Sequence, residues 1–122
     1  MILVVDDDQQ VRATITRGLT ALGYAVRDAA SGEAALELIH QQRPQLVVLD
    51  YMMPGMDGAE TAREIANIDP DLPVVFSTGH AALRHLRQAA GEGASILEKP
   101  FTLAELDQLI SEILHTRRVR SA

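Results

Sequence analysis

Residues 46–55 read LVVLDYMMPG, so four apolar residues are followed by the carboxylate of Asp50 and then by a turn containing proline and glycine. A short apolar run that ends in a turn is typical of a strand buried on both faces, as in a parallel sheet. The apolar run 2–5 leads in the same way into Asp6 and Asp7. Because open α/β sheets bind ligands at the carboxyl ends of their strands, the two runs predict an acidic pocket at that edge.

Five short apolar runs recur along the chain with longer helical patterns between them, at residues 2–5, 24–26, 46–49, 74–76 and 96–97. This alternation predicts βα units and a mostly parallel sheet. The fourth run ends in Ser77 and Thr78, and the fifth leads into Glu98 and Lys99. An acid pair, a lone acid, a hydroxyl and a lysine on four strand ends predict a site for a divalent cation and a phosphoryl group.

Helices are expected between the strands and after the last one. Asp8 and Ser31 are suited to cap the first two helices, and Thr102 forms a capping box with Glu105 at the start of the fifth. The fourth pattern, over residues 81–90, has only two large apolar residues and is followed by glycines at 91 and 93. We therefore expect the fourth helix to be short, mobile or irregular.

Length and composition limit the class of protein. The chain has 122 residues, a net charge of −6 and no cysteine, so we expect one domain over residues 1–116 without disulfides, followed by a basic C-terminal tail over residues 117–122. The acidic balance argues against direct binding of nucleic acid. No long apolar run or signal peptide is visible, so we expect no membrane contact by this segment and a cytoplasmic location.

The strand-end residues suggest a particular chemistry. Asp6, Asp7 and Asp50 would repel one another, and Mg2+ prefers such hard oxygen ligands. Asp50 could then act as a nucleophile and form an aspartyl phosphate by in-line displacement. Lys99 offers an ammonium and Thr78 a hydroxyl to the phosphoryl oxygens. Contacts that form mainly when a phosphoryl group arrives can bias a two-state element.

Four segments in this order resemble the receiver domain of two-component response regulators, namely VVDDD at 4–8, LDYMMPGMDG at 49–58, STG at 77–79 and KPFT at 99–102. The likeness covers essentially the whole chain. It implies a flavodoxin-like, doubly wound α/β fold with a five-stranded parallel sheet in the order 2-1-3-4-5 and five helices. It also implies Mg2+-dependent phosphorylation of an aspartate by a histidine kinase or a histidine phosphotransfer protein.

The resemblance assigns the site residues: the phosphoacceptor Asp50, the metal-binding acids Asp6 and Asp7, the metal-binding backbone carbonyl of Met52, the switch hydroxyl of Thr78 and the phosphate-sensing Lys99. It further implies that the peptide bond between Lys99 and Pro100 is cis, which proline permits at small cost. No enzyme activity is expected beyond self-phosphotransfer and autodephosphorylation at Asp50.

Two features depart from the usual receiver pattern. Ile96 stands three positions before the lysine, where most relatives have an aromatic residue that swings inward when the hydroxyl moves toward phosphate. The segment 93–99 is also one residue shorter than usual. Together with the missing output domain, these features resemble the C-terminal receivers of hybrid sensor histidine kinases, where the partner can be the kinase core of the same longer chain. A free-standing single-domain regulator is the second expectation.

Two other classes of protein remain open. A phosphohydrolase of the haloacid-dehalogenase type also uses a strand-end aspartate, and residues 6–8 would permit one, although the chain lacks a substrate-covering cap. An interaction module that keeps the receiver fold without phosphorylation is the other alternative. Several residues also have purely structural interpretations: Asp57 as a turn stabiliser, Met52, Met53 and Met56 as packing beneath the loop, and His40, His80, His85 and His115 as surface residues.

Overall fold

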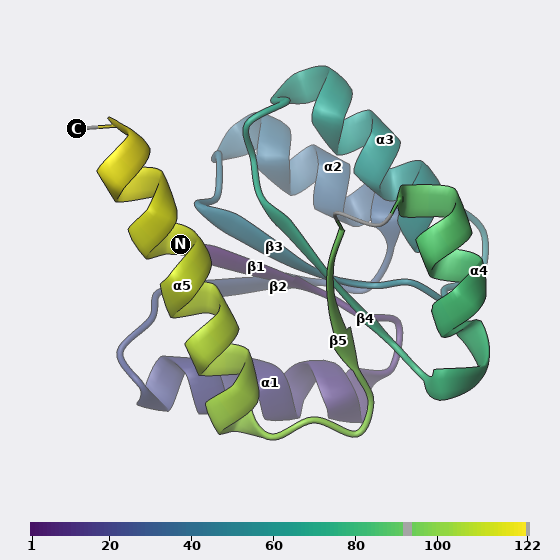
Figure 1. The fold of residues 1–122 in the computed structure, drawn as a ribbon, viewed down its shortest axis with the longest axis horizontal. Coiled ribbons are helices and arrows are strands. Elements are labelled where there is room, and N and C mark those ends of the chain that lie inside the picture. The colour runs from purple at the N-terminus through teal and green to yellow at the C-terminus, as the bar shows by residue number, and fades with distance from the viewer. Residues whose placement is uncertain (92–93, 122) are drawn as a thin grey trace.

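The computed structural model describes residues 1–91 and 94–121 and contains a five-stranded parallel sheet. The strands are β1 (Ile2–Val5), β2 (Val26–Ala29), β3 (Leu46–Asp50), β4 (Val74–Thr78) and β5 (Ser95–Glu98). Their order in the sheet is β2-β1-β3-β4-β5 (Figure 1). This confirms the predicted doubly wound, flavodoxin-like topology.

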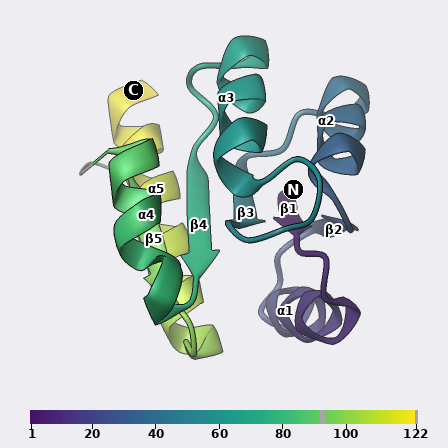
Figure 2. The same ribbon diagram turned by 90° about the vertical axis from the view of Figure 1, so that its right-hand side faces the viewer.

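Among the described residues, five helices cover the two faces of the sheet: α1 (Gln9–Ala21), α2 (Gly32–Gln41), α3 (Gly58–Ile68), α4 (His80–Ala90) and α5 (Leu103–Ser121). Alternate residues of the strands face opposite sides. Leu3, Val47 and Leu49 pack in the core beneath α2, α3 and α4, whereas Val4 and Val48 pack in a second core beneath α1 and α5. Figures 1 and 2 show these two helical layers with the sheet between them.

The second strand differs from the prediction. It was expected at residues 24–26 but begins at Val26 and continues to Ala29, with Arg27 and Asp28 exposed. The reason is its place at the edge of the sheet, where polar residues face solvent and no continuous apolar run marks the strand. Tyr24 precedes the strand, and its hydroxyl donates to Asp107 of α5 at 2.6 Å.

The fourth helix also differs from the prediction. α4 is a regular helix of 11 residues, as long as α3, so the expectation of a short or irregular element is wrong. Alanine, leucine, arginine and glutamine favour a helix without needing many core contacts. Leu86 is completely buried and fastens the helix to the core. Gly93, which contributed to the expectation, lies outside the described residues.

The capping box at the start of α5 is confirmed. The Thr102 hydroxyl accepts a hydrogen bond from the Glu105 amide at 3.1 Å, and the Thr102 amide donates to the Glu105 carboxylate at 3.3 Å. The helix then continues to Ser121, so the basic segment 117–121 belongs to the helix instead of following it. The boundary of the domain at residue 116 stays a prediction. In the part of the chain that the structure describes, no helix combines the length and apolar character needed to cross a membrane.

Candidate functional site

The carboxyl ends of four neighbouring strands bring the predicted site residues to one edge of the sheet. Val5 of β1 is in register with Leu49 of β3, so Asp6 and Asp50, which follow them, lie side by side. Asp50 is in register with Ser77 of β4. The parallel arrangement therefore places residues far apart in sequence around one point, as the pattern of strand ends predicted.

Three carboxylates converge at this edge. Oxygen atoms of Asp6, Asp7 and Asp50 lie within 4.8 Å of one another. Asp6 and Asp50 are 1% and 5% exposed, whereas Asp7 is open to solvent. One Asp6 oxygen, Oδ1, accepts a hydrogen bond from the Asp8 amide at 2.9 Å. Its other oxygen, Oδ2, is buried and has no hydrogen-bond partner among residues 1–91 and 94–121.

Lys99 brings a positive charge to the carboxylates from the loop after β5. Its Nζ lies 3.4 Å from Oδ1 of Asp50 and 3.6 Å from Oδ2 of Asp6. Both distances exceed those of a strong charge-assisted hydrogen bond. The ammonium is therefore close enough to attract both acids but is not locked onto either one.

The electrostatics of the site show that the carboxylates are undercompensated. The pKa of Asp50 is raised from 3.8 to about 6. Burial is the largest cause and the charge of Asp6 the second, whereas Lys99 lowers the pKa. A raised pKa in a cluster of acids, together with the orphaned Asp6 oxygen, indicates that the ionised site lacks positive charge. The donor set of carboxylate oxygens fits a small divalent cation such as Mg2+.

Thr78 lies at the predicted strand end and is almost completely buried. Its hydroxyl donates to the carbonyl of the next residue, Gly79, at 3.3 Å. Within the described residues this hydroxyl therefore has a weak local partner and makes no hydrogen bond to Asp50. It could exchange the Gly79 carbonyl for a better acceptor by rotation about its side-chain bond.

The loop after Asp50 is tightly closed. The Gly58 amide donates to the Tyr51 carbonyl at 2.9 Å, and a Cβ atom on Gly58 would lie 2.7 Å from the Cα of Tyr51. Gly55 has a φ of +75°, which glycine adopts without strain. Asp57 caps α3 by accepting from the Glu60 amide at 2.9 Å, which confirms its predicted structural role.

The methionines of this loop do not share one role. Met53 is buried in the core, and Met56 packs against Gly32 at the start of α2. Met52 has an exposed fraction of 62%, so the prediction that it packs beneath the loop is wrong. The role of its carbonyl as a metal ligand stays a prediction. The predicted cis peptide bond between Lys99 and Pro100 is confirmed.

Three side chains near the site were not predicted from the sequence. Arg12 of α1 donates from Nη1 to the Asp6 carbonyl at 2.7 Å and pairs through Nε with Asp28 at 2.8 Å. His85 is exposed, as predicted, but its Nδ1 also shares a hydrogen bond with the buried Tyr51 hydroxyl. No local sequence pattern links Arg12 to Asp28 or Tyr51 to a histidine in α4.

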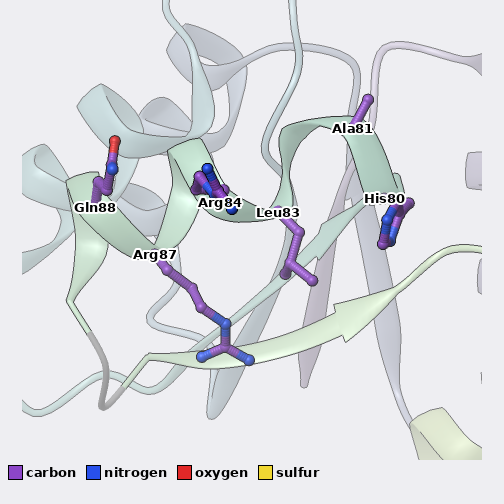
Figure 3. A pocket seen from close by; sticks show the side chains of 6 residues that line it. All are labelled: His80, Ala81, Leu83, Arg84, Arg87 and Gln88. Carbon is purple, nitrogen blue, oxygen red and sulfur yellow. The ribbon is translucent and has the colours of Figure 1, made fainter.

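A cavity of about 770 Å3 lies along α4. Its lining comes from α4 itself: His80, Ala81, Leu83, Arg84, Arg87 and Gln88 (Figure 3). In the figure, Leu83 and Arg87 extend from the helix on the side of β5. Because this lining carries cations and includes none of the strand-end carboxylates, the cavity is not the site predicted for Mg2+.

Comparison with known proteins finds response regulators among the similar sequences. The chain is 43% identical over 106 residues to Response regulator MprA of Mycolicibacterium vanbaalenii, which covers 86% of this chain and 46% of that protein. It is 40% identical over 114 residues to Response regulator MprA of Mycobacterium leprae, covering 93% of this chain and 50% of that protein. The chain thus spans about half the length of these relatives.

Similar structures share the same fold. The crystal structure of the receiver domain of NtrX from Brucella abortus is 34% identical, with a TM-score of 0.89 over 95% of this chain and 99% of that one. A response regulator receiver domain protein from Clostridium thermocellum is 30% identical, with a TM-score of 0.89 over 97% and 96% of the two chains. The family model described as the response regulator receiver domain matches residues 2–111. With its sheet order, its strand-end acids and these matches, the chain belongs to the response regulator receiver domain family.

Proposed function

We propose that Asp50 is the phosphoacceptor of a two-component phosphorelay and that its phosphorylation requires Mg2+. The observation that supports this most strongly is the convergence of Asp6, Asp7 and Asp50 within 4.8 Å, with Lys99 Nζ 3.4 Å from Asp50. The donor is a phosphohistidine on a histidine kinase or on a histidine phosphotransfer protein, as expected for this family.

The proposed step is an in-line displacement at phosphorus. A carboxylate oxygen of Asp50 bonds to phosphorus while the P–N bond of the phosphohistidine breaks, and the leaving imidazole nitrogen keeps the electron pair and takes a proton from solvent. Asp6 and Asp7, with Asp50 and the Met52 carbonyl, would hold Mg2+. When bound, this ion offsets the negative charges of nucleophile and phosphoryl group.

The chain's own residues would also sense the product. Lys99 touches neither Asp6 nor Asp50 tightly, so its ammonium is free to move onto a phosphoryl oxygen. Thr78 would turn its hydroxyl from the Gly79 carbonyl to another phosphoryl oxygen. Both contacts exist only in the phosphorylated state, and such differential contacts are what shift a conformational equilibrium.

The relatives help to decide which kind of protein contains this receiver, a response regulator or a hybrid kinase. Those reported above are response regulators, so they favour a response regulator over the hybrid kinase suggested by the sequence. We propose that the chain works as the receiver of such a regulator in the cytoplasm, where histidine kinases obtain ATP. A kinase core encoded directly upstream in the same reading frame would favour the hybrid kinase instead.

Incubation with Mg2+ and acetyl phosphate tests the proposal. We expect intact-protein mass spectrometry to detect one added phosphoryl group that is acid-labile and sensitive to hydroxylamine. Asp50→Asn should abolish the adduct, whereas the control Asp57→Asn should keep it, because asparagine also caps a helix. Failure of the native chain to form the adduct would support an inert module with a receiver fold. An adduct that persists in Asp50→Asn would point to Asp6 and to a phosphohydrolase.

A further inference from the structure

The residue directly after the phosphoacceptor is linked to α4. Tyr51 is 1% exposed, and its hydroxyl shares a hydrogen bond with Nδ1 of His85. The two rings lie 5.6 Å apart between centroids, at an interplanar angle of 51°. Asp50 and His85 are thus separated by one residue and one hydrogen bond, although they belong to different elements.

The same tyrosine contacts the strand that carries the switch hydroxyl. Its ring meets Phe76 of β4 edge-to-face, with centroids 6.4 Å apart and planes at 82°. Phe76 lies two residues before Thr78, and its register partner in β5 is Ile96. The aromatic contact between Phe76 and Tyr51 therefore lies one strand further into the sheet than Ile96, which has no aromatic ring.

The space around the link leaves room for movement. A cavity of about 530 Å3 lies between the loop after Asp50 and α4, and Tyr51, Met53, Ala82 and His85 are in its lining. In the described residues of α4, Leu86 alone is fully buried. A helix held by one large core residue can shift over a cavity at lower cost than one embedded in a filled core.

We propose that Tyr51 and His85 are a positioning pair that transmits the phosphorylation of Asp50 to α4, in place of an aromatic side chain at residue 96. This inference rests on the proposed function of Asp50. When the backbone at Asp50 adjusts to a phosphoryl group, Tyr51 moves with it, and its hydroxyl carries the change to His85. If occupation of the acidic site by a phosphoryl analogue changes the affinity of α4 for a partner by some factor, binding of that partner must change the affinity of the acidic site for the analogue by the same factor.

The test uses beryllofluoride, a phosphoryl analogue, with Mg2+ and the 15N-labelled chain. The variants are Tyr51→Phe, which keeps the ring and loses the hydroxyl, His85→Ala, and the double substitution. Gln88→Ala, an exposed change on the same helix, is the control. Amide shifts of Asp50 and Thr78 report occupation of the site, and amide shifts of residues 80–89 report the response of α4.

In the native chain and in Gln88→Ala, we expect both groups of amides to shift. In Tyr51→Phe and in His85→Ala, the strand-end shifts should remain, and the α4 shifts should fall by about two- to tenfold, the range that one internal hydrogen bond contributes to an equilibrium constant. The double substitution should lose no more than either single one.

Two results would overturn the inference. An α4 response in Tyr51→Phe equal to that of the native chain would refute the coupling and leave the proposed function intact. If the Asp50 and Thr78 amides of the native chain show no chemical-shift change with beryllofluoride and Mg2+, both the proposed function and the coupling are refuted.

Discussion

Replacing Asp50 with asparagine removes a carboxylate whose ionisation is made unfavourable by burial and by the neighbouring Asp6. The pKa of Asp50 is about 6 in the folded chain against an ordinary value of 3.8. Because the folded state binds the proton more tightly, this group stabilises the fold fully below pH 3.8, and the stabilisation is lost as the pH rises through 6. An asparagine side chain keeps the shape without the charge, so we expect Asp50→Asn to be more stable than the native chain at neutral pH.

The magnitude follows from the pKa difference. At about 1.36 kcal/mol per unit, the shift of Asp50 corresponds to about 3 kcal/mol above pH 7 and to about half of that at pH 5. Solvent at the rim of the site screens part of this energy, so roughly 1–3 kcal/mol is expected. For a chain of 122 residues, each kcal/mol raises the Tm by about 4 °C.

Thermal and urea unfolding in the presence of EDTA, at pH 5 and pH 8, measure this gain. Glu64→Gln, an exposed charge removal on α3, serves as the control and should change stability little at either pH. Adding Mg2+ should stabilise the native chain more than Asp50→Asn and so narrow the difference. A variant that is less stable than the native chain at pH 8, or a gain that is the same at both pH values, would refute the electrostatic reasoning.

Three further substitutions test the loop after Asp50, the cap of α5 and the charge of Lys99. Gly58→Ala places a methyl group 2.7 Å from the Tyr51 backbone, so the loop must move, and urea unfolding should show a loss of about 1–3 kcal/mol together with slower labelling by acetyl phosphate. Thr102→Ala removes the cap of α5 and should cost about 1 kcal/mol in the same assay, with labelling unchanged; equal stability would count against the capping box. Lys99→Met removes a cation that lowers the pKa of Asp50, so carboxyl NMR should find the titration of Asp50 above pH 6; a midpoint at or below 6 would contradict this.

The strands that were predicted well are those in the middle of the sheet. β1 and β3 are buried on both faces, so their sequences are continuous apolar runs with clear ends. β2 lies at the edge, where Arg27 and Asp28 face solvent, and an apolar pattern could not locate it. The helix α4 was misjudged for a related reason, because its stability depends on helix-favouring residues and one buried leucine, and not on a broad apolar stripe.

The acidic site was predictable because the direction of the chain fixes where strand ends meet. Residues at or directly after the ends of β1, β3, β4 and β5 must lie at the same edge once the sheet is parallel, so the sequence predicts that Asp6, Asp50 and Lys99 lie together. The supporting contacts were not predictable in this way. The contact between Tyr51 and His85 joins residues 34 positions apart and depends on how α4 packs, which the sequence pattern left open.

Different residues of α4 pack in the core and line the cavity beside the helix, and this has a consequence for the evolution of such receivers. Leu86 and Ala82 pack in the core, whereas Leu83, Arg84 and Arg87 line the cavity of about 770 Å3. Leu83, Arg84 and Arg87 belong neither to the buried core clusters nor to the carboxylate cluster of the described residues. These three positions can therefore vary in sequence while the core of the fold and the acids at the strand ends stay the same.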